Sequence, residues 1–120
     1  MRILVTGGAG FIGSHLVRRL LNHDHAVVNF DALRYSGNLD NLTDVANNPR
    51  YVFVHGDICD AKAVAGALSE HRIEGIINCA AETHVDRSIL DPSTFARTDV
   101  VGTGILLEEA RKAKVQRYLQ

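Results

Sequence analysis

Four glycines lie within the stretch VTGGAGFIGSH, residues 5–15, between an apolar run and a helix-like pattern. The run Ile3–Val5 is typical of a strand that is buried on both faces. The apolar residues after the glycines recur at helical spacing, namely Ile12, Leu16, Val17, Leu20 and Leu21. A chain that leaves a buried strand and enters a helix within so few residues needs backbone positions free of the limits that a Cβ imposes. The stretch therefore predicts a strand, a tight glycine turn and a helix, in that order.

Strand-like and helix-like patterns also alternate along the rest of the chain. Short apolar runs predict three further strands, at residues 26–30, 51–54 and 76–80. The segment 61–71 has few helix breakers and carries Val64 and Leu68 on one side, which predicts a helix. The segment 33–48 predicts a polar loop with one or two helical turns.

The longest predicted helix begins at Pro92, with Asp91 as its potential cap, and runs to about Lys114. Its apolar positions are supplied by Val100, Val101, Leu106, Leu107 and Ala110. After it, residues 115–120 turn toward a fifth strand. Nearly continuous apolar strands that alternate with helices imply a parallel sheet with helices on both faces. We therefore expect an α/β fold, a Rossmann-type doubly wound parallel sheet, in one domain that spans residues 1–120 and is incomplete at the carboxyl end.

Composition excludes several classes of protein. The chain has 120 residues, 46% hydrophobic and 22% charged, with a formal net charge of -1, as expected for one soluble globular domain. It contains neither an apolar stretch long enough for a membrane span nor a signal-peptide core, so we expect a cytoplasmic protein. Scattered Lys and Arg residues predict no nucleic-acid partner. Cys59 and Cys79 lie outside any Cys-x-x-Cys pattern and are expected to be reduced thiols, and the six histidines show no metal-ligand spacing.

Gly7, Gly10 and Gly13 are spaced three residues apart, and the predicted helix follows them directly. Such a turn lets the backbone approach a pyrophosphate, and the helix N-terminus offers unpaired N–H groups and a partial positive charge to it. A tight turn with no ligand is the alternative. Asp31, at the end of the second predicted strand, is placed to accept hydrogen bonds from an adenosine ribose, which selects NAD. Arg34, close by, could instead pair with the 2′-phosphate of NADP. The residues alone therefore leave the choice between NAD and NADP open.

Three further stretches narrow the interpretation: DALRYSGNLDNL from Asp31, HGDICDA from His55 and AAETHVDRS from Ala80. Together with the glycine turn, they make the chain similar to the extended short-chain dehydrogenase/reductases. Within that group the whole chain resembles the nucleotide-sugar 4,6-dehydratases, especially those that act on dTDP-glucose. The YSGN and HVDRS stretches discriminate best, because sugar epimerases of the same superfamily usually differ at both places. The resemblance implies NAD as cofactor and a nucleotide sugar, dTDP-glucose, as substrate.

The resemblance also implies a role for individual residues. The cofactor would be bound by Gly7, Gly10, Phe11, Ile12, Gly13, Asp31, Ala32, Leu33, Arg34, Asp57, Ile58, Cys79, Ala80, Ala81, Glu82, Thr83 and Thr98. Within this set, Phe11 and Ile12 would contact the pyrophosphate through their backbone, Asp57 and Ile58 would contact the adenine, and Thr83 would also reach the sugar.

Several of these residues have a plainer interpretation. Asp57 is also explained as a turn residue, Glu82 as a surface carboxylate, and Thr98 as a helix threonine with its hydrogen bond satisfied. His84, Asp86 and Arg87 fit an ion pair within their loop as well as a substrate contact. Asp99 stands where the family usually has Asn, which replaces two amide donors with acceptors.

The family's catalytic Tyr-x-x-x-Lys pair does not occur in this sequence, and its Thr-Asp-Glu stretch would begin just beyond Gln120. We therefore expect this chain to carry the NAD-binding portion of a dehydratase, to lack the part that binds the sugar nucleotide, and to be inactive alone. The alternatives are a non-catalytic dinucleotide-binding module and a portion of a nucleotide-sugar 4-epimerase. A last strand without a neighbour also predicts self-association, as a homodimer.

Overall fold

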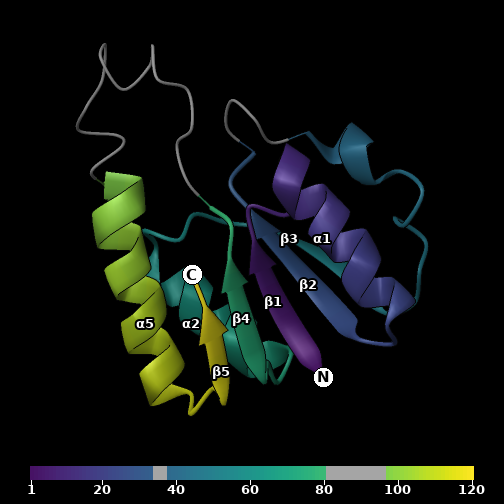
Figure 1. Ribbon diagram of the computed structural model, residues 1–120. Coiled ribbons are helices and arrows are strands. Elements are labelled where there is room, and N and C mark those ends of the chain that lie inside the picture. Colours follow the sequence, from purple (N-terminus) through teal and green to yellow (C-terminus); the bar gives the residue numbers. More distant parts are fainter. Residues whose placement is uncertain (34–37, 81–96) are drawn as a thin grey trace, which may run out of the picture.

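The fold is that of a computed structural model, which describes residues 1–33, 38–80 and 97–120. Its centre is a five-stranded parallel sheet with the strand order β3-β2-β1-β4-β5 (Figure 1). The strands are β1 (Arg2–Thr6), β2 (Ala26–Asp31), β3 (Tyr51–His55), β4 (Gly75–Asn78) and β5 (Arg117–Leu119). This order confirms the predicted Rossmann-type parallel sheet, including a fifth strand after residue 115.

The helices of the described segments alternate with these strands. They are α1 (Phe11–Asn22), the short 3-10 helix η1 (Leu39–Leu42), α2 (Ala61–Glu70), the π-helical turn η2 (Arg97–Gly102) and α5 (Thr103–Lys112). The 3-10 helix is the helical turn predicted within residues 33–48. The start of the predicted long helix, at Pro92, lies outside the described residues. None of the described helices is long and apolar enough to span a membrane.

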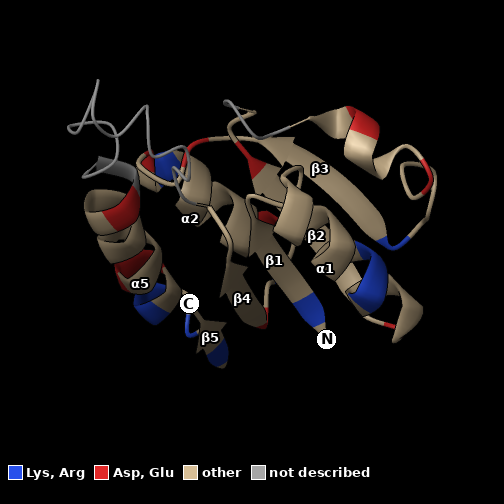
Figure 2. Ribbon diagram, turned by 45° about the horizontal axis from the view of Figure 1, so that its top comes forward, with Lys and Arg blue, Asp and Glu red and all other residues tan. Residues whose placement is uncertain are grey.

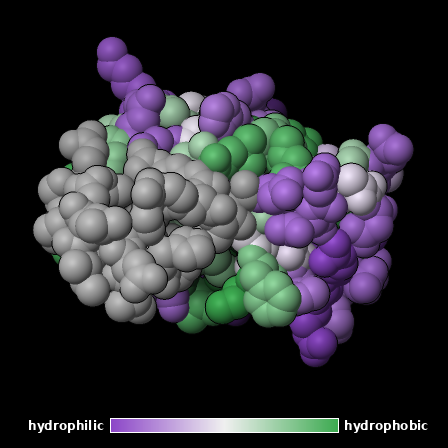
Figure 3. Space-filling view, turned by 90° about the horizontal axis from the view of Figure 1, so that it is seen from above, coloured by the Kyte–Doolittle hydropathy of each residue, from purple (hydrophilic) through white to green (hydrophobic). Residues whose placement is uncertain are grey.

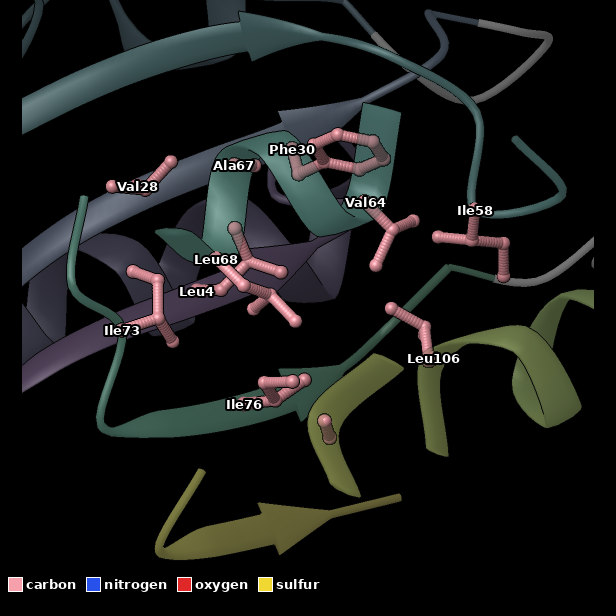
Figure 4. Packing of buried hydrophobic residues seen from close by; sticks show 11 residues of the cluster. Leu4, Val28, Phe30, Ile58, Val64, Ala67, Leu68, Ile73, Ile76 and Leu106 are labelled. Atoms are coloured by element: carbon pink, nitrogen blue, oxygen red, sulfur yellow. The ribbon is translucent and has the colours of Figure 1, made fainter. Parts of the chain in front are cut away.

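Alternate residues of the strands face opposite sides of the sheet, and helices cover both faces. Leu4 points to the side covered by α2 and α5, where it packs with Phe30, Ile76 and Leu106 (Figure 4). The neighbouring residues of β1 point to the other side and pack against α1 in a second cluster, made of Ile3, Val5, Val17, Leu21, Val27 and Leu42. These two clusters explain why the strand sequences are apolar at nearly every position.

The apolar positions of α5 and η2 divide between core and surface. Leu106 and Ala110 are buried against the sheet, but Val100, Val101 and Leu107 are exposed, Val100 by 70%. Only part of the apolar set therefore faces the core, because one helix face meets the sheet and α2 while the other has no neighbour among the described residues.

Local hydrogen bonds explain several element boundaries. Asp60 caps α2, its side chain accepting from the Ala63 N–H at 3.2 Å. Asn38 caps η1 by accepting from the Asp40 N–H at 2.9 Å. β4 ends at Asn78, two positions before the predicted end at Ala80.

Because all five strands are parallel, their carboxyl ends meet at one edge of the sheet, where the glycine turn also lies.

Candidate functional site

The glycine turn joins β1 to α1 at the carboxyl edge of the sheet. Gly7 has a φ of 68°, and a Cβ on it would lie 2.8 Å from the Ala80 nitrogen and from the Cys79 carbonyl. A Cβ on Gly13 would lie 2.2 Å from the Gly7 oxygen. Both obstacles are backbone atoms that have no rotamer to change, so these two positions require glycine. The predicted turn is thus confirmed, with α1 packed directly onto the end of β1.

The first three amides of α1 have no partner within the helix. The first bond of the helix runs from the Ser14 N–H to the Gly10 carbonyl at 2.9 Å, so the amides of Phe11, Ile12 and Gly13 precede the helical ladder. Gly10, the N-cap residue, has no side chain that caps them. The side chains of Phe11 and Ile12 are 76% and 74% exposed. This arrangement is suited to an anion, which the backbone amides and the helix dipole both favour.

No Lys or Arg residue stands in the first turn of α1, where the anion would bind. Arginines stand at the amino ends of β1 and β5, away from the turn (Figure 2). Seen from above, the end where the strands finish shows apolar surface beside a polar region (Figure 3). Among the described residues, the groups at the start of α1 that suit an anion are therefore backbone amides.

Asp31 ends β2 beside the glycine turn and is only 7% exposed. Its Oδ2 accepts from the Ala9 N–H at 2.9 Å, and its Oδ1 accepts from the Leu33 N–H at 2.7 Å. A carboxylate has about four lone-pair sites, so these two bonds leave acceptor capacity for the hydroxyls of a ribose. Ala32 follows, and its carbonyl accepts from His55 Nε2 at 3.1 Å. The bond from Ala9 therefore connects Asp31, the residue predicted to bind the ribose, to the glycine turn that is predicted to bind the pyrophosphate.

Asp57 and Ile58 follow β3 on the same edge. Asp57 Oδ1 accepts from the Cys59 N–H at 2.8 Å, which is the turn role that the sequence left open for this residue. The Ile58 side chain is buried in the core cluster, next to Gly102. The contact of Asp57 and Ile58 with an adenine stays a prediction.

A buried polar network fixes the exit of β4. The Thr6 hydroxyl donates to Asn78 Oδ1 at 2.5 Å and accepts from the N–H groups of Cys79 and Ala80, each at 3.1 Å. Burial raises the pKa of the Cys79 thiol, which keeps it protonated near neutral pH. Asn78 was not predicted as part of the site. The sequence feature that could have indicated Asn78 is its single amide side chain at the end of the apolar run Ile76–Ile77.

Several of the remaining predicted site residues lie outside the part of the chain that the structure describes. Arg34, Ala81, Glu82 and Thr83 lie outside the described residues, as do His84, Asp86 and Arg87 of the same loop. Thr98 lies in η2, as does the exposed Asp99. Ser14, which is not among the predicted site residues, donates its hydroxyl to the Phe11 carbonyl at 3.0 Å.

The two cysteines are both described and form no disulfide. No group of three or more His, Cys, Asp or Glu side chains that suits a metal ion occurs in the described segments.

The sheet, the glycine turn and the acid at the end of β2 define a dinucleotide-binding fold of the short-chain dehydrogenase type. The family model of GDP-mannose 4,6 dehydratase matches residues 4–120, so the chain belongs to that family.

Individual relatives narrow the likeness further. The chain is 56% identical over 113 residues to a dTDP-glucose 4,6-dehydratase of Escherichia coli, covering 93% of this chain and 31% of that protein. The crystal structure of the dTDP-glucose 4,6-dehydratase DesIV from Streptomyces venezuelae, with NAD bound, matches with a TM-score of 0.92 and 49% identity, over 98% of this chain and 38% of DesIV. A UDP-glucose 4-epimerase from Thermotoga maritima matches at 37% identity and a TM-score of 0.88, over 98% of this chain and 36% of the epimerase.

The chain thus spans about a third of the length of these relatives, and it is homologous to the amino-terminal, NAD-binding region of dTDP-glucose 4,6-dehydratases.

Proposed function

We propose that this chain binds NAD at the glycine turn and is the NAD-binding portion of a dTDP-glucose 4,6-dehydratase. The observation that carries the proposal is the hydrogen bond between the Ala9 N–H and Asp31 Oδ2 at 2.9 Å. It joins the acid expected on the adenosine ribose to the turn expected on the pyrophosphate. In this geometry the Gly7 and Gly13 positions have no room for a Cβ, and three amides of α1 are left for an anion.

Each part of the site would hold one part of the cofactor. The amides of Phe11, Ile12 and Gly13 would bind the pyrophosphate, and Asp31 would accept from the ribose hydroxyls. Cys79 and Ala80, fixed by Thr6 and Asn78, would lie along the cofactor where β4 ends. Bound NAD would supply the hydride acceptor for oxidation at C4 of the sugar and the hydride that returns to C6. The product of the whole reaction would be dTDP-4-keto-6-deoxyglucose.

Calorimetric titration of the chain with NAD and with NADP tests the cofactor part of this proposal. A buried carboxylate at Asp31 would repel a 2′-phosphate, so we expect NAD to bind about tenfold or more tightly than NADP, equivalent to about 1.4 kcal/mol. Asp31→Asn removes the charge and should narrow that ratio. Folded protein that gives no heat with millimolar NAD, or that prefers NADP, contradicts the assignment.

The reaction part is tested separately, with dTDP-glucose and NAD. The sequence contains no Tyr-x-x-x-Lys pair, so we expect no 4-keto-6-deoxy sugar from these 120 residues alone. The same assay on a longer protein that contains this sequence should yield the keto sugar. A C4-inverted sugar from that protein would instead favour the epimerase alternative.

A further inference from the structure

Gly8 is the one glycine of the turn that the three-residue spacing does not explain. Its backbone has no positive φ, so an alanine there would be unstrained by conformation. A Cβ on Gly8 would nevertheless lie 2.3 Å from Asn29 Oδ1 and 2.6 Å from Asn29 Cγ. The atoms nearest to a Cβ on Gly7 or Gly13 belong to the backbone, whereas the three nearest to a Cβ on Gly8 all belong to the Asn29 side chain.

That side chain is completely buried in the middle of the sheet. Asn29 lies on β2 beside Val5 of β1 and Phe53 of β3. Its Nδ2 donates to the Tyr51 hydroxyl at 3.1 Å, which holds the carboxamide in one orientation. Asn29 Oδ1 has no hydrogen-bond donor among the described residues and lies under the Gly8 backbone. A fully buried amide with an unpaired oxygen is costly, which points to a specific role for Asn29.

We propose that Asn29 is a positioning residue for the NAD-binding turn, which it supports from below at Gly8. The inference rests on the proposed function. The carboxamide sets how far Gly8 stands above β2. Gly8 is followed by Ala9, whose N–H bonds to Asp31, so the height of Gly8 also sets the distance between the turn and the acid that would bind the ribose. Position 8 is thus restricted to glycine by the Asn29 side chain and not by its own backbone conformation.

If Asn29 sets the height of Gly8, a second substitution at Asn29 should rescue a substitution at Gly8. Gly8→Ala should push the turn away from β2 and weaken NAD binding by about tenfold or more. In Gly8→Ala/Asn29→Ala the added methyl group occupies space that the carboxamide has vacated, so the affinity for NAD should recover most of that loss. The matched control is Gly13→Ala/Asn29→Ala, in which the obstacle is the Gly7 carbonyl and no recovery is expected. The double-mutant cycle of wild type, Gly8→Ala, Asn29→Ala and Gly8→Ala/Asn29→Ala measures the interaction between the two positions.

Calorimetry with NAD and thermal unfolding without NAD are measured on all variants. Recovery of NAD affinity in the Gly8 double variant alone supports the inference, and if Gly8→Ala fails to fold, recovered folding and NAD binding in the double variant support it equally. Equal NAD binding by wild type and Gly8→Ala, or equal loss in Gly8→Ala and its double variant, overturns it.

A recovery of unfolding temperature without any recovery of NAD affinity also overturns it, because Asn29 would then be structural only. If wild-type protein binds no NAD, the proposed function fails first, and the unfolding data alone show whether Gly8 and Asn29 are coupled.

Discussion

Replacement of Thr6 by valine tests whether the hydroxyl at the end of β1 holds the exit of β4. Valine has nearly the same shape but removes one donated bond, to Asn78, and two accepted bonds, from the Cys79 and Ala80 amides. Both amides keep a second acceptor, because the Cys79 N–H also donates to the Thr6 carbonyl at 3.1 Å and the Ala80 N–H to Asn78 Oδ1 at 3.2 Å. The loss is therefore one full bond and two shared ones. At about 0.5–1.5 kcal/mol per bond, Thr6→Val should lower the free energy of unfolding by about 2 kcal/mol.

Urea denaturation measures this loss, and Thr6→Ser is the matched control. Serine keeps the hydroxyl and removes only a methyl group, which should cost about 1 kcal/mol. Both variants should shift the urea midpoint without changing the slope. A Thr6→Val variant as stable as the wild type, or one no less stable than Thr6→Ser, refutes the assignment of these bonds.

Two further predictions concern the helix faces. Leu106 is fully buried between α5 and the sheet, so Leu106→Ala should lower the free energy of unfolding by about 2–5 kcal/mol. Leu107 lies on the exposed side, so Leu107→Ala should change the free energy of unfolding by less than about 0.5 kcal/mol. Equal losses of the two variants in urea denaturation would contradict the helix orientation. Arg18, which bonds to Asp44, holds the pKa of that carboxyl below its ordinary value. The ion pair stabilises the fold at any pH above the ordinary carboxyl pKa, and this stabilisation is lost as the pH falls through the lowered pKa of Asp44. The difference in Tm between wild type and Asp44→Asn should therefore vanish in acid. A difference in Tm that grows in acid would refute the ion pair.

The order of elements and the glycine turn could be predicted from the sequence because both depend on local patterns. Apolar runs and helical spacing each involve neighbouring residues, and the turn lies directly between the two patterns. Asp31 was found in the same way, since it ends an apolar run. The predicted end of β4 was two residues too late, because Cys79 and Ala80 are apolar but bond to the Thr6 side chain instead of continuing the strand.

The contacts between distant segments could not be predicted. Asn29 faces Gly8, and Thr6 faces Asn78, only because the strands pair in one particular register. The same limit applies to η1, where Asn41 Nδ2 donates to the Ala9 carbonyl at 2.8 Å and thereby ties the loop after β2 to the turn. The exposed side of α5 was also not predictable, because apolar residues on both sides of a helix do not show which side meets the sheet.

The location of the cofactor is the central claim, and NMR of the ¹⁵N-labelled chain tests it most directly. During titration with NAD, the amide signals of Phe11, Ile12 and Gly13 should shift or broaden most, because these groups would donate to the pyrophosphate. The signals of Glu74 and Gly75, at the amino end of the sheet, should stay in place. Unchanged signals at the start of α1 with NAD at millimolar concentration, or shifts confined to the amino end of the sheet, would contradict the account.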